Sequence, residues 1–159
     1  MELSPEEVIE YPIDIVEEAP TVEGFYEIVS EYMEAHKKTS GGYTNTVVTL
    51  DHSLLLKTRP KQTRNDMLYD FGEIVTSLKR KYPIIFIILS QLNRAIDHPE
   101  RNEDGKYGNY VLESDIFGAD ALLQHADTVI GLNRPGKQQI RFYGPDRYII
   151  PDDKLLVLQ

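Results

Sequence analysis

Two apolar runs that each end in polar residues constrain the fold of this chain more than any other feature. The first run covers residues 46–50 and is followed by Asp51, and the second covers residues 84–89 and is followed by Ser90 and Gln91. Continuous apolar runs are typical of parallel strands that are covered on both faces. Because the carboxyl ends of parallel strands meet at one edge of a sheet, the runs predict that the Asp51 carboxylate and the Gln91 amide lie side by side.

Two helices accompany these strands in the predicted arrangement. Between the runs, from about residue 65 to residue 82, apolar residues recur with helical spacing and charged residues occupy the opposite face. Pro83 ends this helix and opens the second strand. A second helix is predicted from residue 22 to about residue 36, with Thr21 as its N-cap. Strands alternating with helices indicate a layered α/β fold with a mainly parallel central sheet.

Weaker patterns predict the remaining elements. They are a short strand at 13–15, a polar connection at 93–114, a short helix at about 116–125, and further strands at 128–132, 139–143 and 154–158. The last run is still apolar where the sequence stops. We therefore expect the chain to be part of a longer protein.

Composition excludes several classes of protein. The 159 residues suit one domain with a real core. There is no cysteine for a disulfide or a thiolate metal site, and the four histidines lack the spacing of zinc ligands. No apolar stretch reaches the roughly 20 residues that span a membrane, and the acidic N-terminus does not resemble a signal peptide. We expect a cytoplasmic location and no membrane partner.

The residues at the strand ends suggest phosphate chemistry. A carboxylate such as Asp51 at the end of a buried strand is suited to hold Mg²⁺, although it can also simply cap the next turn. The neutral amide of Gln91, widened by the hydroxyl of Ser90, is suited to hydrogen-bond a γ-phosphate, although a turn at a strand end is the simpler alternative. The sequence contains no G-x-x-x-x-G-K-[ST] phosphate loop. This chain alone should therefore bind nucleotide poorly.

Basic residues suggest contact with nucleic acid on an otherwise acidic chain of net charge −9. Four of them follow the strand-end aspartate closely: Lys57, Arg59, Lys61 and Arg64. Such a cluster is suited to phosphate contacts, and a solvated loop is the alternative. The connection that begins at Arg94 mixes basic and aromatic residues, as single-stranded nucleic-acid sites do, but acidic residues in the same stretch weaken the signal.

Three ordered segments resemble the C-terminal motor domain of DnaB-type replicative DNA helicases. They are VVTLDHSLL at 47–55, ILSQLNR at 88–94 and SDIFGADALLQHAD at 114–127. The resemblance covers roughly residues 13–134. It implies that residues 1–159 form a single, partial RecA-like domain. It also implies ATP and Mg²⁺ as cofactors, and a homohexameric parent enzyme that moves along single-stranded DNA and meets a primase or a helicase loader.

The resemblance also implies roles for individual residues. Asp51 matches the magnesium aspartate, and Gln91 matches the glutamine that links the γ-phosphate to a DNA loop. The segment that contacts DNA in the family falls on Phe117, Gly118 and Asp120, and the connections after Leu56 and Arg94 match loops that face the ring's channel.

The chain departs from the family pattern in places. His52 stands where the family usually has tyrosine, and Phe117 and Gly118 stand where it has arginine and glutamate. The phosphate loop and the catalytic glutamate would precede Met1, and the arginine finger would follow Gln159, so we expect the chain alone to lack ATPase activity. Another RecA-like ATPase, such as a recombinase or a clock-type protein, and a non-catalytic interaction module remain as alternatives.

Overall fold

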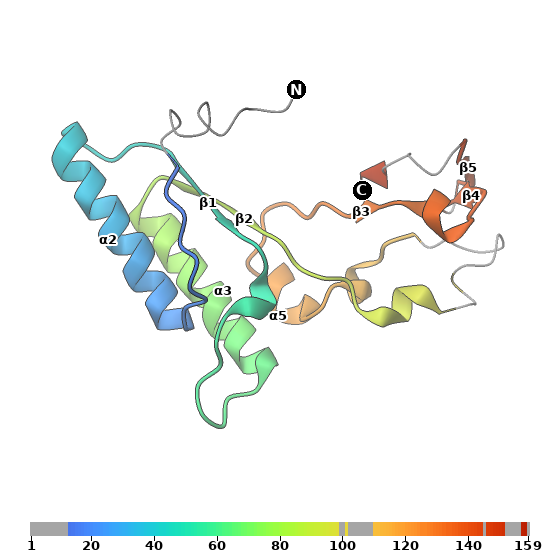
Figure 1. Ribbon diagram of the computed structural model, residues 1–159, viewed down its shortest axis with the longest axis horizontal. Coiled ribbons are helices and arrows are strands. Elements are labelled where there is room, and N and C mark those ends of the chain that lie inside the picture. The colour runs from blue at the N-terminus through green and yellow to red at the C-terminus, as the bar shows by residue number, and fades with distance from the viewer. Residues whose placement is uncertain (1–12, 99–100, 102–109, 145, 152–156, 159) are drawn as a thin grey trace.

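The computed structural model describes residues 13–98, 101, 110–144, 146–151 and 157–158, which form a mixed α/β arrangement (Figure 1). The helices are α2 (Val22–Ser40), α3 (Arg64–Lys81) and α5 (Ala119–Leu123). The strands are β1 (Thr46–Leu50), β2 (Ile84–Ile88), β3 (Leu132–Asn133), β4 (Phe142–Tyr143), β5 (Tyr148–Ile149) and β6 (Val157–Leu158). Short 3₁₀ helices are η1 (Ser53–Leu55), η2 (Arg94–Asp97), η3 (Glu113–Asp115) and η4 (Pro135–Gln138).

The strands β1 and β2 form a parallel pair, as the two apolar runs predict. Thr46 lies opposite Ile84, and Leu50 lies opposite Ile88. The amide of Leu89 continues the pairing beyond β2 by donating to the Leu50 carbonyl at 3.0 Å. The crossover between the two strands contains α3. The carboxyl ends of both strands therefore lie at the same edge, as expected for a strand–helix–strand unit.

The helix α2 begins where the sequence predicts. The Thr21 hydroxyl caps it by accepting a hydrogen bond from the Gly24 amide at 3.2 Å. Its buried side chains recur every three or four residues on one face and are Val22, Phe25, Val29 and Met33. The helix continues to Ser40, further than the predicted end near residue 36, and Gly41 closes it in a left-handed conformation.

The helix α3 has a complete N-terminal capping box. The Thr63 hydroxyl accepts from the Asp66 amide at 3.1 Å, while the Asp66 carboxylate accepts from the Thr63 amide at 3.3 Å. These bonds satisfy donors that the first turn of a helix leaves unpaired. The helix ends at Lys81, immediately before Tyr82 and Pro83, which agrees with the predicted stop.

The main core lies between α2, α3 and one face of the β1–β2 pair. Phe25 from α2 packs edge-on against Phe71 from α3, with ring centroids 5.2 Å apart, and against Phe86 from β2 at 6.1 Å. Other buried members include Met67, Leu68 and Leu78. Each fully buried side chain of this size contributes about 1.5–3 kcal/mol of burial free energy, so this layer accounts for the stable part of the fold.

The prediction that both faces of the sheet are covered is wrong for the described residues. Residues that alternate along the strands leave one face open, with Val47 58% exposed, Ile85 61% and Ile87 50%. The other face packs on the helical core through side chains such as Val48 and Phe86. Successive side chains on a strand point to opposite faces, so helices on one side cover only every second residue.

The prediction of a third strand at residues 128–132 is also wrong. Residues 128–131 form no strand, and Val129 and Ile130 are exposed. Leu132 instead enters β3, which pairs antiparallel with β6. An apolar run specifies a strand only when a neighbouring strand is available for pairing, and the described residues provide none beside this segment.

Other weak predictions are realised in part. The strand expected at 139–143 shrinks to β4, which pairs antiparallel with β5. The strand expected at 154–158 includes β6, and its residues 154–156 lie outside the described residues. The helix expected at 116–125 shortens to α5, and residues 13–15 are not in a strand. Among the described strands, β1 and β2 form one parallel two-stranded sheet, and the other two pairs form separate antiparallel sheets.

Of the helices in the described ranges, none combines the length and apolar character that a membrane crossing requires.

Candidate functional site

The candidate site is the edge of the sheet where β1 and β2 end. Asp51 follows β1 directly, and Ser90 and Gln91 follow β2 within three residues. The parallel register brings these ends together, and the His52 ring next to Asp51 lies against the Gln91 amide, with their Nε2 atoms 3.4 Å apart. The Asp51 carboxylate and the Gln91 side chain are both exposed. Asp51 and Gln91 therefore follow strands that end at the same edge of the sheet, and the side chain in contact with the Gln91 amide is that of His52.

His52 is part of this edge, although the sequence indicates it only as a departure from a family pattern. Its Nδ1 accepts a hydrogen bond from the Leu54 amide at 3.3 Å and so caps η1. Its other ring nitrogen faces Gln91. The peptide bond between Asp51 and His52 is cis. The signal available in the sequence is the position of an imidazole directly after a strand-end aspartate.

The residues after β2 form a second backbone ladder, with the segment that precedes α5. The Phe117 amide donates to the Gln91 carbonyl at 3.0 Å, and the Asn93 amide donates to the Asp115 carbonyl at 2.6 Å. The Ser90 hydroxyl donates to the Phe117 carbonyl at 3.5 Å. Gln91 is thus attached through its main chain to the segment that is predicted to contact DNA.

A buried ion pair holds this second segment in shape. Asp115 is 1% exposed, and both of its carboxylate oxygens accept from the Arg101 guanidinium, at 2.7 and 2.8 Å. The Leu112 amide donates to the same carboxylate at 2.8 Å. Burial alone would raise the pKa of Asp115, but the hydrogen bonds from Arg101 and Leu112 and the charge of the guanidinium lower it below its ordinary value. This pair is not evident in the sequence, because neither residue stands out by its spacing.

The residues predicted to contact DNA differ in their exposure. Phe117 is 38% exposed, and Asp120 is exposed at the start of α5. Gly118 has a left-handed φ of 69°, and a Cβ there would lie 2.3 Å from Cδ1 of Leu68. Glycine at this position is therefore explained by the close packing of the segment on α3, independently of any ligand.

The predicted basic cluster is divided by its internal contacts. Arg59 forms ion pairs with Glu23 and Asp70, and Arg64 donates to the Leu54 and Leu56 carbonyls at 2.8 and 2.9 Å. These two arginines hold the loop onto the helices.

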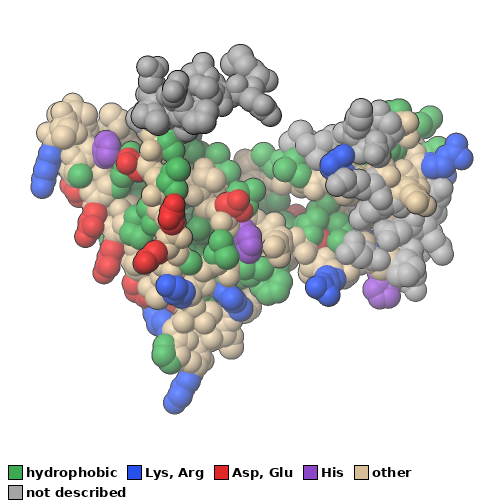
Figure 2. All heavy atoms as spheres, in the orientation of Figure 1, with side chains coloured by type: hydrophobic (Ala, Val, Ile, Leu, Met, Phe, Trp, Pro, Cys, Tyr) green, Lys and Arg blue, Asp and Glu red, His purple; other side chains and the backbone are tan. Residues whose placement is uncertain are grey.

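The remaining basic residues of the prediction are exposed. They are Lys57 and Lys61 in the loop after η1 and Arg94 in η2. Figure 2 shows basic side chains gathered at the loop after η1 and acidic side chains along α2, so charge is separated on this face.

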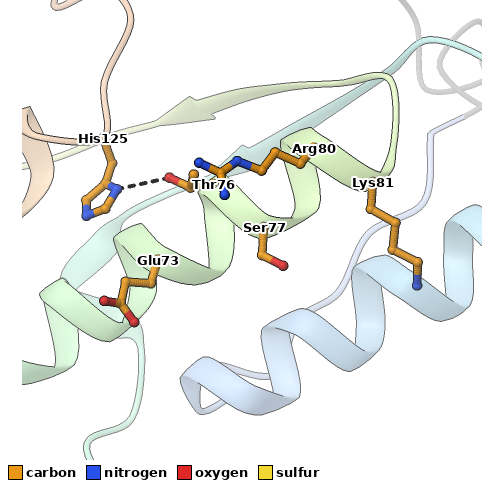
Figure 3. Close-up of a pocket in the computed structure, with 6 residues that line it drawn as sticks. All are labelled: Glu73, Thr76, Ser77, Arg80, Lys81 and His125. Carbon is orange, nitrogen blue, oxygen red and sulfur yellow. Dashed lines mark hydrogen bonds between the residues drawn. The ribbon is translucent and has the colours of Figure 1, made fainter.

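A shallow pocket of about 450 Å³ lies elsewhere, on the C-terminal half of α3 (Figure 3). Its lining residues are Glu73, Thr76, Ser77, Arg80, Lys81 and His125. The Thr76 hydroxyl and Nδ1 of His125 are 2.9 Å apart, and the Lys79–Asp127 ion pair fixes the same segment to the helix. Since α3 runs back from the end of β1 to the start of β2, this pocket lies toward the amino ends of the strands, away from Asp51.

The strand ends offer one side chain that suits Mg²⁺, the Asp51 carboxylate, and not a complete set of metal ligands. No group of three or more histidine and acidic side chains among the described residues is arranged to hold a metal ion. Mg²⁺ in nucleotide sites is commonly held by one or two carboxylates, with phosphates and water completing the shell. The exposed carboxylate of Asp51 fits that pattern. The phosphate-loop motif G-x-x-x-x-G-K-[ST], whose backbone would bind the phosphates, does not occur in the sequence.

Comparison with known proteins assigns no family to the chain, because no protein-family model and no curated protein matches it.

Proposed function

We propose that this chain is part of the RecA-like motor domain of a DnaB-type replicative DNA helicase. The observation that carries the proposal is the parallel register of β1 and β2, which brings Asp51 and Gln91 to one edge of the sheet. A carboxylate beside a neutral amide at the carboxyl ends of parallel strands is an arrangement suited to a nucleotide.

In this proposal the strand-end residues divide the work between metal and phosphate. Asp51 supplies one oxygen ligand to Mg²⁺, and its exposure leaves room for phosphate oxygens and water. When bound with ATP, Mg²⁺ neutralises charge on the β- and γ-phosphates. Gln91 approaches the γ-phosphate as a neutral hydrogen-bonding group, and the Ser90 hydroxyl lies beside it.

The second ladder supports the proposed link between nucleotide and DNA. Gln91 and Phe117 share a main-chain hydrogen bond of 3.0 Å, so a shift of one strand end displaces the segment that includes Phe117, Gly118 and Asp120. In the proposal this segment contacts single-stranded DNA, together with Lys57, Lys61 and Arg94. Arg59 and Arg64 act there mainly by shaping the loop, because their guanidinium groups already bind protein partners.

The proposal places the active enzyme in the cytoplasm as a homohexamer that meets a primase or a helicase loader. The phosphate loop, the catalytic glutamate and the arginine finger come from other parts of a longer polypeptide or from a neighbouring subunit. The chain of 159 residues keeps Asp51 and Gln91 and does not hydrolyse ATP by itself.

The test uses the complete reading frame that encodes these residues. The encoded protein is expected to hydrolyse ATP faster when single-stranded DNA is added, and Asp51→Ala should lower kcat by at least about 100-fold through loss of charge stabilisation. Asp146→Ala removes an exposed carboxylate far along the chain and serves as the matched control.

Three results would contradict the proposal. A reading frame that encodes no phosphate loop and shows no ATPase activity would favour the non-catalytic interaction module. Full activity in Asp51→Ala would remove the aspartate from the nucleotide site. Strand exchange without unwinding would instead favour a recombinase.

A further inference from the structure

We infer that His52 is a positioning residue that fixes which end of the Gln91 amide faces outward. The starting observation is the double use of one imidazole at the strand ends. Its Nδ1 accepts a hydrogen bond from the Leu54 amide at 3.3 Å, and its Nε2 lies 3.4 Å from Nε2 of Gln91.

The first contact determines the proton position on the ring. An imidazole nitrogen that accepts a hydrogen bond carries no proton, so in neutral His52 the proton resides on Nε2. The backbone donor belongs to the capped 3₁₀ helix η1 and cannot reverse its role. His52 therefore presents an N–H group, not a lone pair, to Gln91.

The second contact then determines the orientation of the amide. Two donors do not hydrogen-bond each other, and a carboxamide exchanges its oxygen and nitrogen by a half-turn of its last torsion. A hydrogen bond between the two side chains therefore requires that Oε1 of Gln91 faces the Nε2–H group of His52. The NH₂ group of Gln91 then points away from the imidazole, and Gln91 is exposed to solvent.

This orientation has a chemical consequence that rests on the proposed function. A side chain that presents two N–H donors recognises an anionic oxygen, such as one on a phosphate, and disfavours a donor in the same place. It also explains a use for histidine at this position. The single hydroxyl of a tyrosine cannot both accept from the Leu54 amide and donate to Gln91 from opposite sides of a ring.

Nitrogen NMR on the 159-residue chain, at about pH 8 where histidine is ordinarily neutral, tests the inference. His52 is expected to be in the Nε2–H tautomer. Gln91→Leu removes the acceptor and should shift the His52 Nε2 resonance, whereas Gln91→Glu keeps an oxygen acceptor and should retain the hydrogen-bonded signal. The resonances of His36 and His125 should not move, which confirms that each variant is folded.

The reciprocal variant examines the same bond from the other side. His52→Ala should shift the side-chain amide resonances of Gln91 and leave those of Gln62, whose amide donates to Asp70. His98→Ala removes an exposed histidine and is the matched control.

Three findings would overturn the inference: an Nδ1–H tautomer for His52, an unshifted His52 signal in Gln91→Leu, or identical shifts in Gln91→Leu and Gln91→Glu. Because these measurements need no nucleotide, their failure is distinct from failure of the proposed function. A parent protein without ATPase activity would contradict the proposed function and leave the hydrogen bond intact.

Discussion

Gly72 lies within α3, and the His125 ring occupies the space where a side chain would be. A Cβ at this position would lie 2.2 Å from Cδ2 and 2.8 Å from Cγ of that ring. Nδ1 of the same ring lies 2.9 Å from the hydroxyl oxygen of Thr76, one turn further along the helix. The glycine therefore allows the segment after α5 to pack closely on α3.

Replacing Gly72 by alanine should destabilise the protein despite the better helix propensity of alanine. The methyl group gains up to about 1 kcal/mol from propensity, but displacing a packed ring costs about 1–3 kcal/mol. We expect a lower midpoint in urea denaturation. The Gly72→Ala/His125→Ala double variant should recover stability relative to Gly72→Ala, because the overlap is removed.

Gly42→Ala is the matched control for this prediction. A Cβ at Gly42 meets nothing within 4 Å, so its effect on the urea midpoint should be small. Equal destabilisation by Gly72→Ala and Gly72→Ala/His125→Ala would show that the His125 ring is not what excludes a side chain at this position.

The Asp115 carboxylate should make stability depend on pH in acid. Burial raises its pKa, but the hydrogen bonds from Arg101 and from the Leu112 amide, together with the charge of the guanidinium, lower the pKa below its ordinary value. Its contribution is therefore complete above the pKa of the unfolded chain, ordinarily about 3.9, and is lost as the pH falls through the lower folded value.

Asp115→Asn should flatten the decline of unfolding free energy with falling pH below about pH 4 and should lower stability near neutral pH, because Arg101 loses its charged partner. Urea denaturation at several pH values measures both effects. Glu31→Gln, at an exposed position on α2, should leave the pH profile unchanged. A steep acid decline that persists in Asp115→Asn would assign the dependence to other carboxylates.

At the scale of elements, the start of α3 depends on the reciprocal bonds between Thr63 and Asp66. Thr63→Ala removes the hydroxyl that accepts from the Asp66 amide and should cost about 1 kcal/mol. Thr63→Ser keeps the hydroxyl and should retain most of the stability. Circular dichroism during urea denaturation measures the difference, and a serine variant as unstable as the alanine variant would exclude the hydroxyl as the cause.

The elements that the sequence predicts well are those with local signals at both ends. Thr21 is the predicted N-cap of α2 and Pro83 is the predicted stop of α3, whereas the Thr63 cap of α3 is an observation of the structure. The parallel pairing of β1 and β2 follows from the helical segment between them, because a helix of that length returns the chain to the same end of the sheet.

Elements whose partners are not local were not predictable in this way. The apolar residues Val129 and Ile130 have strand-like composition, yet no strand lies beside them in the described part of the chain. At the candidate site, the positions of Asp51 and Gln91 follow from the strand ends. The contact between His52 and Gln91 depends on side-chain geometry beyond the strands, and the Arg101–Asp115 pair depends on a fold that spacing does not reveal.

At the scale of the whole molecule, the main cluster of buried apolar side chains lies in one layer. Figure 1 shows α2 and α3 against the β1–β2 pair at one end and the two-residue strands β3 to β5 at the other. The buried aromatic and aliphatic side chains of the main core all belong to the first end or to α5. The open face of the β1–β2 pair, formed by Val47, Ile85, Ile87 and Leu89, is therefore not required for the integrity of that core.

Polar substitution on the open face should reduce self-association without loss of stability. Exposed apolar patches promote association, and β-branched threonine suits a strand. The Ile85→Thr/Ile87→Thr variant should scatter less light at high concentration while its urea midpoint changes little. Leu78→Ala, in the core, should instead cost about 2–5 kcal/mol. Unaltered scattering in the threonine variant would exclude this face as the cause of association.

The two backbone ladders connect the candidate site to two parts of the molecule. The strands before Asp51 and Gln91 are paired with each other along all five residues, so both residues follow strands of the layered core. The chain after β2 also pairs outside that layer. Gln91 pairs with Phe117, and Asn93 pairs with Asp115. A displacement of the Gln91 main chain at this edge would therefore be transmitted by the hydrogen bond to the Phe117 amide, and the partly exposed ring of Phe117 would move with it.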